Sequence, residues 1–124
     1  MPDAAVASAA SLQPRIAALS DRIEAERRLP DELVGAFADL GFFRLCVPRD
    51  LGGVEASPRV LVETIESIAR ADGAAGWCVM IGATTGVVSA YLDEAPARAI
   101  YAGDPLAEMG GVFAPPGRAA VDGD

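Results

Sequence analysis

The stretch that decides the fold is Gly73–Leu92, GAAGWCVMIGATTGVVSAYL, which runs for twenty residues without a charge between Asp72 and Asp93. A helix that is apolar on every side lies either in a membrane or in the core of a protein, and about twenty apolar residues suffice to cross a bilayer. Against a membrane span, the stretch contains four glycines, two threonines, a serine and an internal tryptophan, Trp77, and its flanks are acidic. We therefore predict a central helix buried in a protein core, with a transmembrane helix as the alternative.

Before this stretch, the apolar residues recur with the spacing of amphipathic helices. Residues 1–11 are expected to form a frayed lead-in. A first helix is predicted from Ser11, with Pro14 in its first turn and a buried stripe formed by Leu12, Ile16, Leu19 and Ile23. A second helix is predicted to begin at Pro30 and to stop at Gly41, with its buried stripe formed by Leu33, Phe37 and Leu40.

Two further helices have clear start signals. Ser57 and Pro58 are typical of an N-cap followed by a first helical residue. Asp93 in the same way predicts a short helix over residues 94–101. The chain is thus predicted to be all-α, a bundle of about five helices around a buried apolar central helix.

The composition excludes several kinds of function. The chain has a net charge of −8, its ten cations are all arginine, and it contains no histidine and no lysine. The lack of histidine excludes a histidine base and a histidine metal site, and the lack of lysine excludes a phosphate-binding loop lysine and a Schiff base. The excess of acidic residues disfavours binding to nucleic acid. We nominate no catalytic residue and no metal site. The two cysteines, Cys46 and Cys78, have apolar neighbours and are expected to be buried, reduced thiols of a cytoplasmic protein.

Two faces of the central helix differ in size and polarity. One is a ridge of small residues that lets another backbone come close: Cys78, Gly82, Gly86 and Ala90. The other is larger and partly polar: Trp77, Ile81, Thr84, Thr85 and Val88. This second face could line a pocket, or its hydroxyls could simply bond to carbonyls one helical turn back. The sequence alone leaves both interpretations open.

After the helices, residues 111–114 predict the one strand of the chain, stopped by Pro115-Pro116-Gly117. The Asp-Gly pair at 122–123 predicts a hairpin turn, but no second strand follows it. We therefore expect residues 12–110 to form a helical domain and residues 111–124 to be the truncated start of a β-domain.

The order of these pieces resembles the amino-terminal helical domain of the acyl-CoA dehydrogenase family. The resemblance is carried by the helix ending at Gly41, by the run Phe43–Pro48 with the Gly52-Gly53 turn, by Ala69–Trp77 and by Gly111–Gly117. Complete members add a β-domain and a carboxy-terminal bundle. The resemblance implies a homotetrameric flavoprotein that uses FAD on an acyl-CoA or aromatic substrate, with the catalytic base in a domain that this chain lacks.

The resemblance also implies positions for the site. Val112, Phe113 and Ala114 match the segment that lies against the isoalloxazine ring, and Trp77, Ile81, Thr84 and Thr85 are expected to wall the substrate and flavin pocket. Many dehydrogenases of the family have Thr-Glu-Pro where this chain has Ala114-Pro115-Pro116. The assignment of a dehydrogenase activity to this chain is weakened by that difference.

The sequence from Gly76-Trp77 to Gly86 is similar to that of a branch of the family whose members hydroxylate aromatic substrates. These enzymes use reduced flavin supplied by a separate reductase, and FMN is an alternative cofactor for them. Some members of that branch have a histidine at the position of Thr85.

Three functional hypotheses follow. The first is the amino-terminal piece of a flavin-dependent oxidoreductase of the acyl-CoA dehydrogenase type, and the second is the same piece of an aromatic monooxygenase. In both, the 124-residue chain alone is expected to retain no flavin and to be inactive. The third is a non-catalytic helical module whose apolar faces bind a partner protein.

Overall fold

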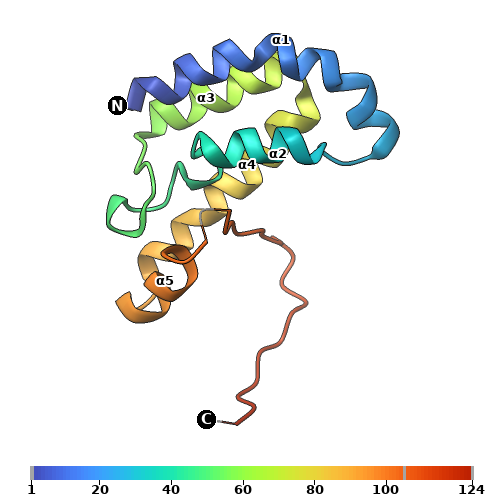
Figure 1. Cartoon of the computed structure of the whole chain (residues 1–124). Coiled ribbons are helices and arrows are strands. Elements are labelled where there is room, and N and C mark those ends of the chain that lie inside the picture. The colour runs from blue at the N-terminus through green and yellow to red at the C-terminus, as the bar shows by residue number, and fades with distance from the viewer. Residues whose placement is uncertain (1, 105, 124) are drawn as a thin grey trace.

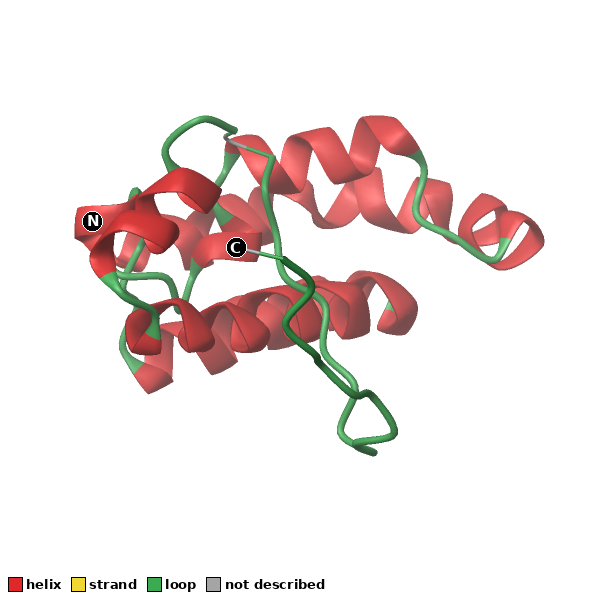
Figure 2. Ribbon diagram, turned by 90° about the horizontal axis from the view of Figure 1, so that it is seen from below, coloured by secondary structure: helices red, strands yellow, loops and turns green. Residues whose placement is uncertain are grey.

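Helices account for all the regular structure in the described part of the chain. The computed structural model describes residues 2–104 and 106–123, and Figure 2 shows only helices and loops in them. The α-helices are α1 (Pro2–Glu26), α2 (Asp31–Asp39), α3 (Pro58–Ala71), α4 (Gly73–Thr85) and α5 (Glu94–Tyr101). Three 3-10 helices connect them: η1 (Phe42–Arg44), η2 (Arg49–Leu51) and η3 (Gly86–Tyr91). The prediction of an all-α fold of about five helices is confirmed.

The helices α1 and α3 lie side by side and run in the same direction (Figure 1). In the second half of α3, the Gln13 side-chain amide donates to the carbonyl and the hydroxyl of Ser67, at 2.9 and 3.0 Å. Further along, the Ser20 hydroxyl donates to the carboxylate of Asp72. A register in which 13 faces 67 and 20 faces 72 is that of a parallel pair.

The start of α1 differs from the prediction. The helix begins at Pro2, not at Ser11, and Pro14 lies inside it. Ala5 and Ala9 are buried and extend the stripe of Ile16 and Ile23 toward the N-terminus. The prediction that residues 1–11 form a frayed lead-in is wrong, because this stretch is rich in alanine, which has the highest helix propensity and packs closely against a neighbouring helix.

The bounds and buried residues of α2 agree largely with those predicted from the sequence. Leu33 and Phe37 are fully buried, and Gly41 ends the helix with a φ of 73°, a conformation that glycine adopts at no steric cost. Leu40 was predicted to be buried but is 38% exposed. It follows the last helical residue, Asp39, so the helical periodicity no longer sets its direction.

Local caps begin α3, as predicted, and α4. The Ser57 hydroxyl accepts from the backbone N–H of Val60, and the Asp72 carboxylate accepts from that of Ala75 at 2.8 Å. Between the two helices, Gly76 lies against Ala69 so closely that an added Cβ would be 2.8 Å from the Ala69 Cα. Two ion pairs between residues four positions apart, Arg59–Glu63 and Glu66–Arg70, lie on α3.

The small-residue ridge of α4 and η3 receives the segment that follows α2. A Cβ on Gly82 would lie 2.7 Å from the Phe43 ring, and one on Gly86 would lie 3.0 Å from a Val47 methyl group. Larger residues at these two positions would push Phe43 and Val47 away from the core. The predicted close approach over this ridge is therefore confirmed.

Only one face of α4 is buried in this chain. Ala75, Val79 and Ala83 are among its buried residues, whereas Trp77 is 63% exposed and Tyr91, at the end of η3, is 85% exposed. By length and composition alone, Gly73–Tyr91 would suffice to cross a membrane, a test that core helices of soluble proteins also pass. The predicted central helix is therefore buried on one face, and its face with Trp77 is exposed in this chain.

Two other predictions are corrected. Residues 111–114 form no strand and belong to the irregular segment that leaves the helices toward the C-terminus (Figure 1). A strand needs a partner for its backbone groups, and no described segment pairs with this one. The cysteines are both free, as predicted, but Cys46 is half-buried and Cys78 is exposed. Cys78 sits one residue after Trp77, on the uncovered side of α4.

Candidate functional site

A groove of about 360 Å³ lies where α4 meets the chain that follows α5. Its walls come from the loop before α2, from α2 itself, from the segment after α2, from α4 and from residues 108–110. The lining residues are Leu29, Val34, Phe43, Trp77, Cys78, Ile81, Gly82, Glu108, Met109 and Gly110. This volume is within the usual range of small-molecule sites. A mostly apolar lining with few polar groups is also typical of such sites.

Two of the four predicted pocket residues line this groove. Trp77 and Ile81 are four residues apart and therefore share one face of α4. The indole of Trp77 is largely exposed, so it is free to contact a ligand. Gly82, on the next turn, leaves the space in which the Phe43 ring closes the groove floor.

The other two, Thr84 and Thr85, do not line the groove. Their hydroxyls donate to the carbonyls of Met80 and Ile81, at 2.6 and 2.7 Å. The interpretation in which these hydroxyls bond one turn back is the one that the structure bears out. Thr85 nevertheless touches the terminal segment, because a Cβ on Gly111 would lie 2.8 Å from the Thr85 Oγ1.

The predicted flavin segment does not reach the groove in this structure. Val112 is 80% exposed and Phe113 is 91% exposed, and Ala114 is exposed as well. The C-terminal segment contributes instead the residues just before them, Glu108, Met109 and Gly110. The structure therefore brings Trp77 and Ile81 together with residues 108–110, but not with Val112–Ala114.

Glu108 is the residue that sequence reasoning missed. It is the one charged residue between Asp104 and Arg118, and this isolation in an uncharged stretch is the signal that marks it. Burial among apolar neighbours raises the pKa of its carboxyl group. Burial also raises the pKa of the Cys78 thiol, and the charges of Glu108 and Asp72 raise it further. Within the described residues, no group of three or more metal-ligating side chains occurs.

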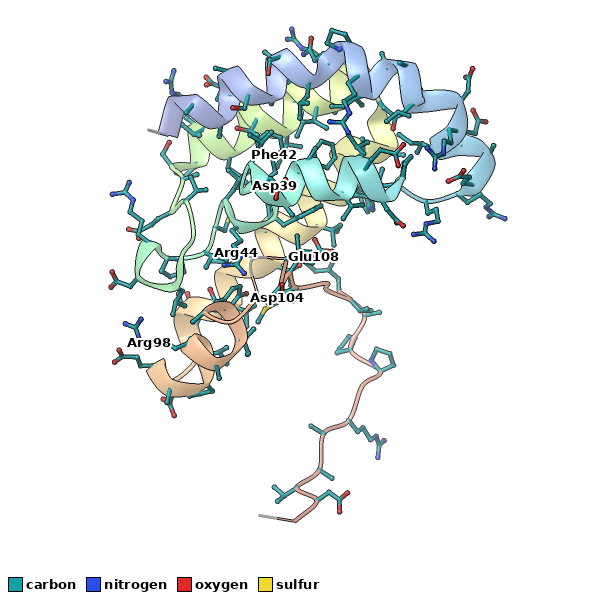
Figure 3. All side chains as sticks on the ribbon, viewed as in Figure 1. Asp39, Phe42, Arg44, Arg98, Asp104 and Glu108 are labelled. Carbon is teal, nitrogen blue, oxygen red and sulfur yellow. The ribbon has the colours of Figure 1, made fainter. Side chains whose placement is uncertain are left out.

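The Arg44 side chain anchors the segment between α5 and Glu108, and this segment places Glu108 at the groove. Its guanidinium donates to the Tyr101 carbonyl at 3.3 Å and also to the carbonyl of Asp104. From there the Asp104 carboxylate accepts from the backbone N–H of Leu106 at 2.8 Å. Figure 3 shows Arg44, Asp104 and Glu108 close to one another at the lower end of α4.

Comparison with known proteins now gives the family. Residues 6–98 match the model of the acyl-CoA dehydrogenase N-terminal domain. The chain belongs to this family. The acyl-CoA dehydrogenase N-terminal domain is thus formed by α1 to α5, and the groove lies on the side of α4 that the domain leaves uncovered.

Several similar proteins are named monooxygenases, and HsaA is named a flavin-dependent monooxygenase. The chain is 34% identical over 130 residues to the indole-3-acetate monooxygenase of Pseudomonas putida, covering 97% of the chain and 33% of that protein. It is 32% identical over 111 residues to the oxygenase subunit HsaA of Mycobacterium tuberculosis, covering 90% of the chain and 28% of that protein. The crystal structure of HsaA superposes with a TM-score of 0.80 at 30% identity, over 86% of the chain and 29% of HsaA. The chain thus spans about a third of the length of these relatives.

Proposed function

We propose that this domain supplies one wall of the substrate and flavin pocket of a flavin-dependent aromatic monooxygenase. The observation that carries the proposal is the groove in which Trp77 and Ile81 of α4 face residues 108–110. Its apolar lining suits an aromatic ring, and it exposes an indole that can stack against one.

Monooxygenation is favoured over acyl-CoA dehydrogenation for two reasons. The relatives that span nine-tenths or more of the chain are named monooxygenases. In addition, Ala114 stands where many dehydrogenases have a threonine, so a hydroxyl contact to the flavin is missing there.

In this proposal, the residues of the domain bind the flavin ring and the substrate and exclude water from them. They do not transfer protons. Flavin supplies the redox chemistry when bound, and the domain offers an apolar surface for the ring and the substrate. No arginine lines the groove among the described residues, so the groove itself offers no cation to a flavin phosphate. We therefore propose that FAD, or FMN, is bound mainly by other parts of the protein, and that this chain alone retains neither.

The same proposal covers the wider setting of the domain. Residues 12–110 would act as the helical domain and residues 111–124 as the start of a β-domain that covers the exposed face of α4. The whole protein would be a cytoplasmic homotetramer that meets no membrane. A carbonate wash of expressing cells tests the last point, because recovery solely in detergent would contradict it.

A domain exchange tests the proposed function. The matching N-terminal segment of HsaA is replaced by this chain, and the hybrid is assayed for flavin binding and for substrate hydroxylation with a reductase. We expect the hybrid to bind flavin and to hydroxylate, because the two folds superpose closely. Trp77→Ala in the hybrid should raise KM, since the indole forms part of the groove wall.

The control is Val62→Ala, which changes an exposed residue of α3 away from the groove. It should leave KM and kcat unchanged. A hybrid that folds and binds flavin, but whose KM is indifferent to Trp77→Ala, would show that this face of α4 does not contact substrate.

A second measurement addresses the chain alone. We expect gel filtration with FAD or FMN to yield protein without stoichiometric flavin absorbance, and without turnover. One flavin retained per chain would contradict the proposed division of labour between the domains.

A further inference from the structure

The groove combines one aromatic face with one carboxylate in otherwise apolar surroundings. Trp77 and Glu108 both line it, together with the side chains of Leu29, Val34, Phe43, Ile81 and Met109. The charge of Glu108 acts on the groove wall, because it contributes to raising the pKa of the Cys78 thiol. Glu108 is an exposed residue whose carboxyl group is only partly desolvated, so its charge acts on a ligand in the groove moderately more strongly than a charge in open water.

The carboxylate of Glu108 has no partner in the part of the chain that the structure describes. It takes part in no ion pair or hydrogen bond there. Arg27 and Arg28 line an adjoining hollow, on the far side of Leu29 and Cys78, and Arg28 is paired with Asp31 at 2.7 Å. On its other side, Glu108 shares a smaller hollow with Asp31, whose carboxylate is paired with Arg28. Glu108 therefore supplies the one charge among the described residues that line the groove.

We propose that Trp77 and Glu108 make this groove selective for aromatic ligands that carry an amine or another cationic group, and that they disfavour carboxylate ligands. An ammonium group is attracted both by a carboxylate and by the face of an indole. A ligand carboxylate would meet the like charge of Glu108. This inference rests on the proposed function and narrows its substrate class, in a direction opposite to an aryl acetate such as the one in the name of the Pseudomonas putida relative.

A matched pair of ligands tests the selectivity on the chain as it is. Trp77 is the sole tryptophan of the chain, so its fluorescence, excited at a wavelength that phenyl groups do not absorb, reports directly on the groove. The ligands are 2-phenylethylamine and phenylacetate, which share a phenyl ring and a short linker and differ in charge. We expect the amine to bind at least about tenfold more tightly than the acid near pH 8.

Two variants that each remove one negative charge separate the groove from the net charge of −8. Glu108→Gln should bring the ratio of the two dissociation constants to within about threefold, by weakening the amine and strengthening the acid. Asp21→Asn, on the exposed side of α1, should leave the ratio within about twofold of the original.

Three outcomes would overturn the inference: an equal ratio in the original chain and in Glu108→Gln, a preference for phenylacetate, or no quenching by either ligand at millimolar concentration. The binding ratio needs no flavin, so its failure is distinct from failure of the proposed function. An HsaA hybrid that hydroxylates while the ratio is unaffected by Glu108→Gln removes only the selectivity. A ratio that behaves as expected beside an inactive hybrid removes only the monooxygenase.

Discussion

The guanidinium of Arg44 lies over the ring of Tyr101, with its Cζ 5.2 Å from the ring centroid. Arg44 is 8% exposed and Tyr101 is 3% exposed, so this cation–π contact is largely removed from water. It joins the segment after α2 to the end of α5 across 57 positions of sequence. Through it, the chain turns back toward α4 and places Glu108 and Met109 at the groove.

Substitution of Arg44 should therefore destabilise the domain. Arg44→Met keeps much of the volume but removes the donors to the carbonyls of Tyr101 and Asp104. We expect a loss of about 2 kcal/mol in the free energy of unfolding, because hydrogen bonds from charged groups to buried acceptors are worth about 1.5–3 kcal/mol. Urea unfolding followed by circular dichroism measures it.

The matched control is Tyr101→Phe. The Tyr101 hydroxyl is buried and has no hydrogen-bond partner among the described residues. Removing it should leave stability unchanged or raise it by up to about 1 kcal/mol, since an unsatisfied buried polar group is unfavourable. A loss as large as that of Arg44→Met would mean that the hydroxyl has a partner after all.

The groove floor should be sensitive to a single methyl group on Gly82. In Gly82→Ala the new Cβ would lie 2.7 Å from the Phe43 ring, so Phe43 must move. We expect a loss of about 1–3 kcal/mol, together with a change in the fluorescence of Trp77, which lines the same groove.

Gly35→Ala is the control for that effect. Gly35 lies within α2 and a Cβ there meets nothing within 4 Å. This variant should be stabilised by about 0.5–1 kcal/mol, because alanine loses less backbone entropy than glycine in a helix. Thermal unfolding of both variants checks the pair, and a stabilised Gly82→Ala would show that Phe43 repacks freely.

The cap of α4 should contribute measurably to stability. Asp72 accepts both from the Ala75 N–H and from the Ser20 hydroxyl, so it caps α4 and ties it to α1. Asp72→Ala should cost about 1–2 kcal/mol. Asp93 precedes α5 without any side-chain cap bond, so Asp93→Ala should cost less than about 0.5 kcal/mol. Equal losses in urea unfolding would contradict this assignment.

The alkylation of Cys78 should depend on Glu108. Burial and the negative charges of Glu108 and Asp72 raise the pKa of the Cys78 thiol, so the reactive thiolate forms at higher pH than in a free thiol. Glu108→Gln removes one of these charges and should lower that pKa. The midpoint of the iodoacetamide rate against pH should shift downward.

Peptide mass spectrometry separates Cys78 from Cys46, whose thiol pKa is raised by burial alone and should not respond. Asp21→Asn serves as the control for a distant charge. An unchanged Cys78 midpoint in Glu108→Gln would place the Glu108 carboxylate away from the groove wall.

Features that depend on residues close in sequence could be predicted from the sequence. Ser57 and Asp72 each cap a helix through a backbone N–H three residues later, and Gly41 ends α2 by its own backbone conformation. The back-bonding of Thr84 and Thr85 is equally local, and it was one of the two alternatives. The burial of Cys78 was predicted wrongly, because its apolar sequence neighbours do not show which side of α4 is covered.

By itself, then, the sequence determined the existence of the helices, the caps at Ser57 and Asp72 and the small-residue ridge, because a turn of helix is settled by residues three or four positions apart. The predicted cap at Asp93 is wrong, since its side chain makes no cap bond. The tertiary structure alone decided that α1 reaches back to Pro2, that residues 111–114 have no strand partner and that Glu108 lines the same groove as Trp77. Each of these depends on segments far apart in the chain, and Glu108 reaches the groove through the hold of Arg44 on the end of α5. No periodicity within one segment contains that information.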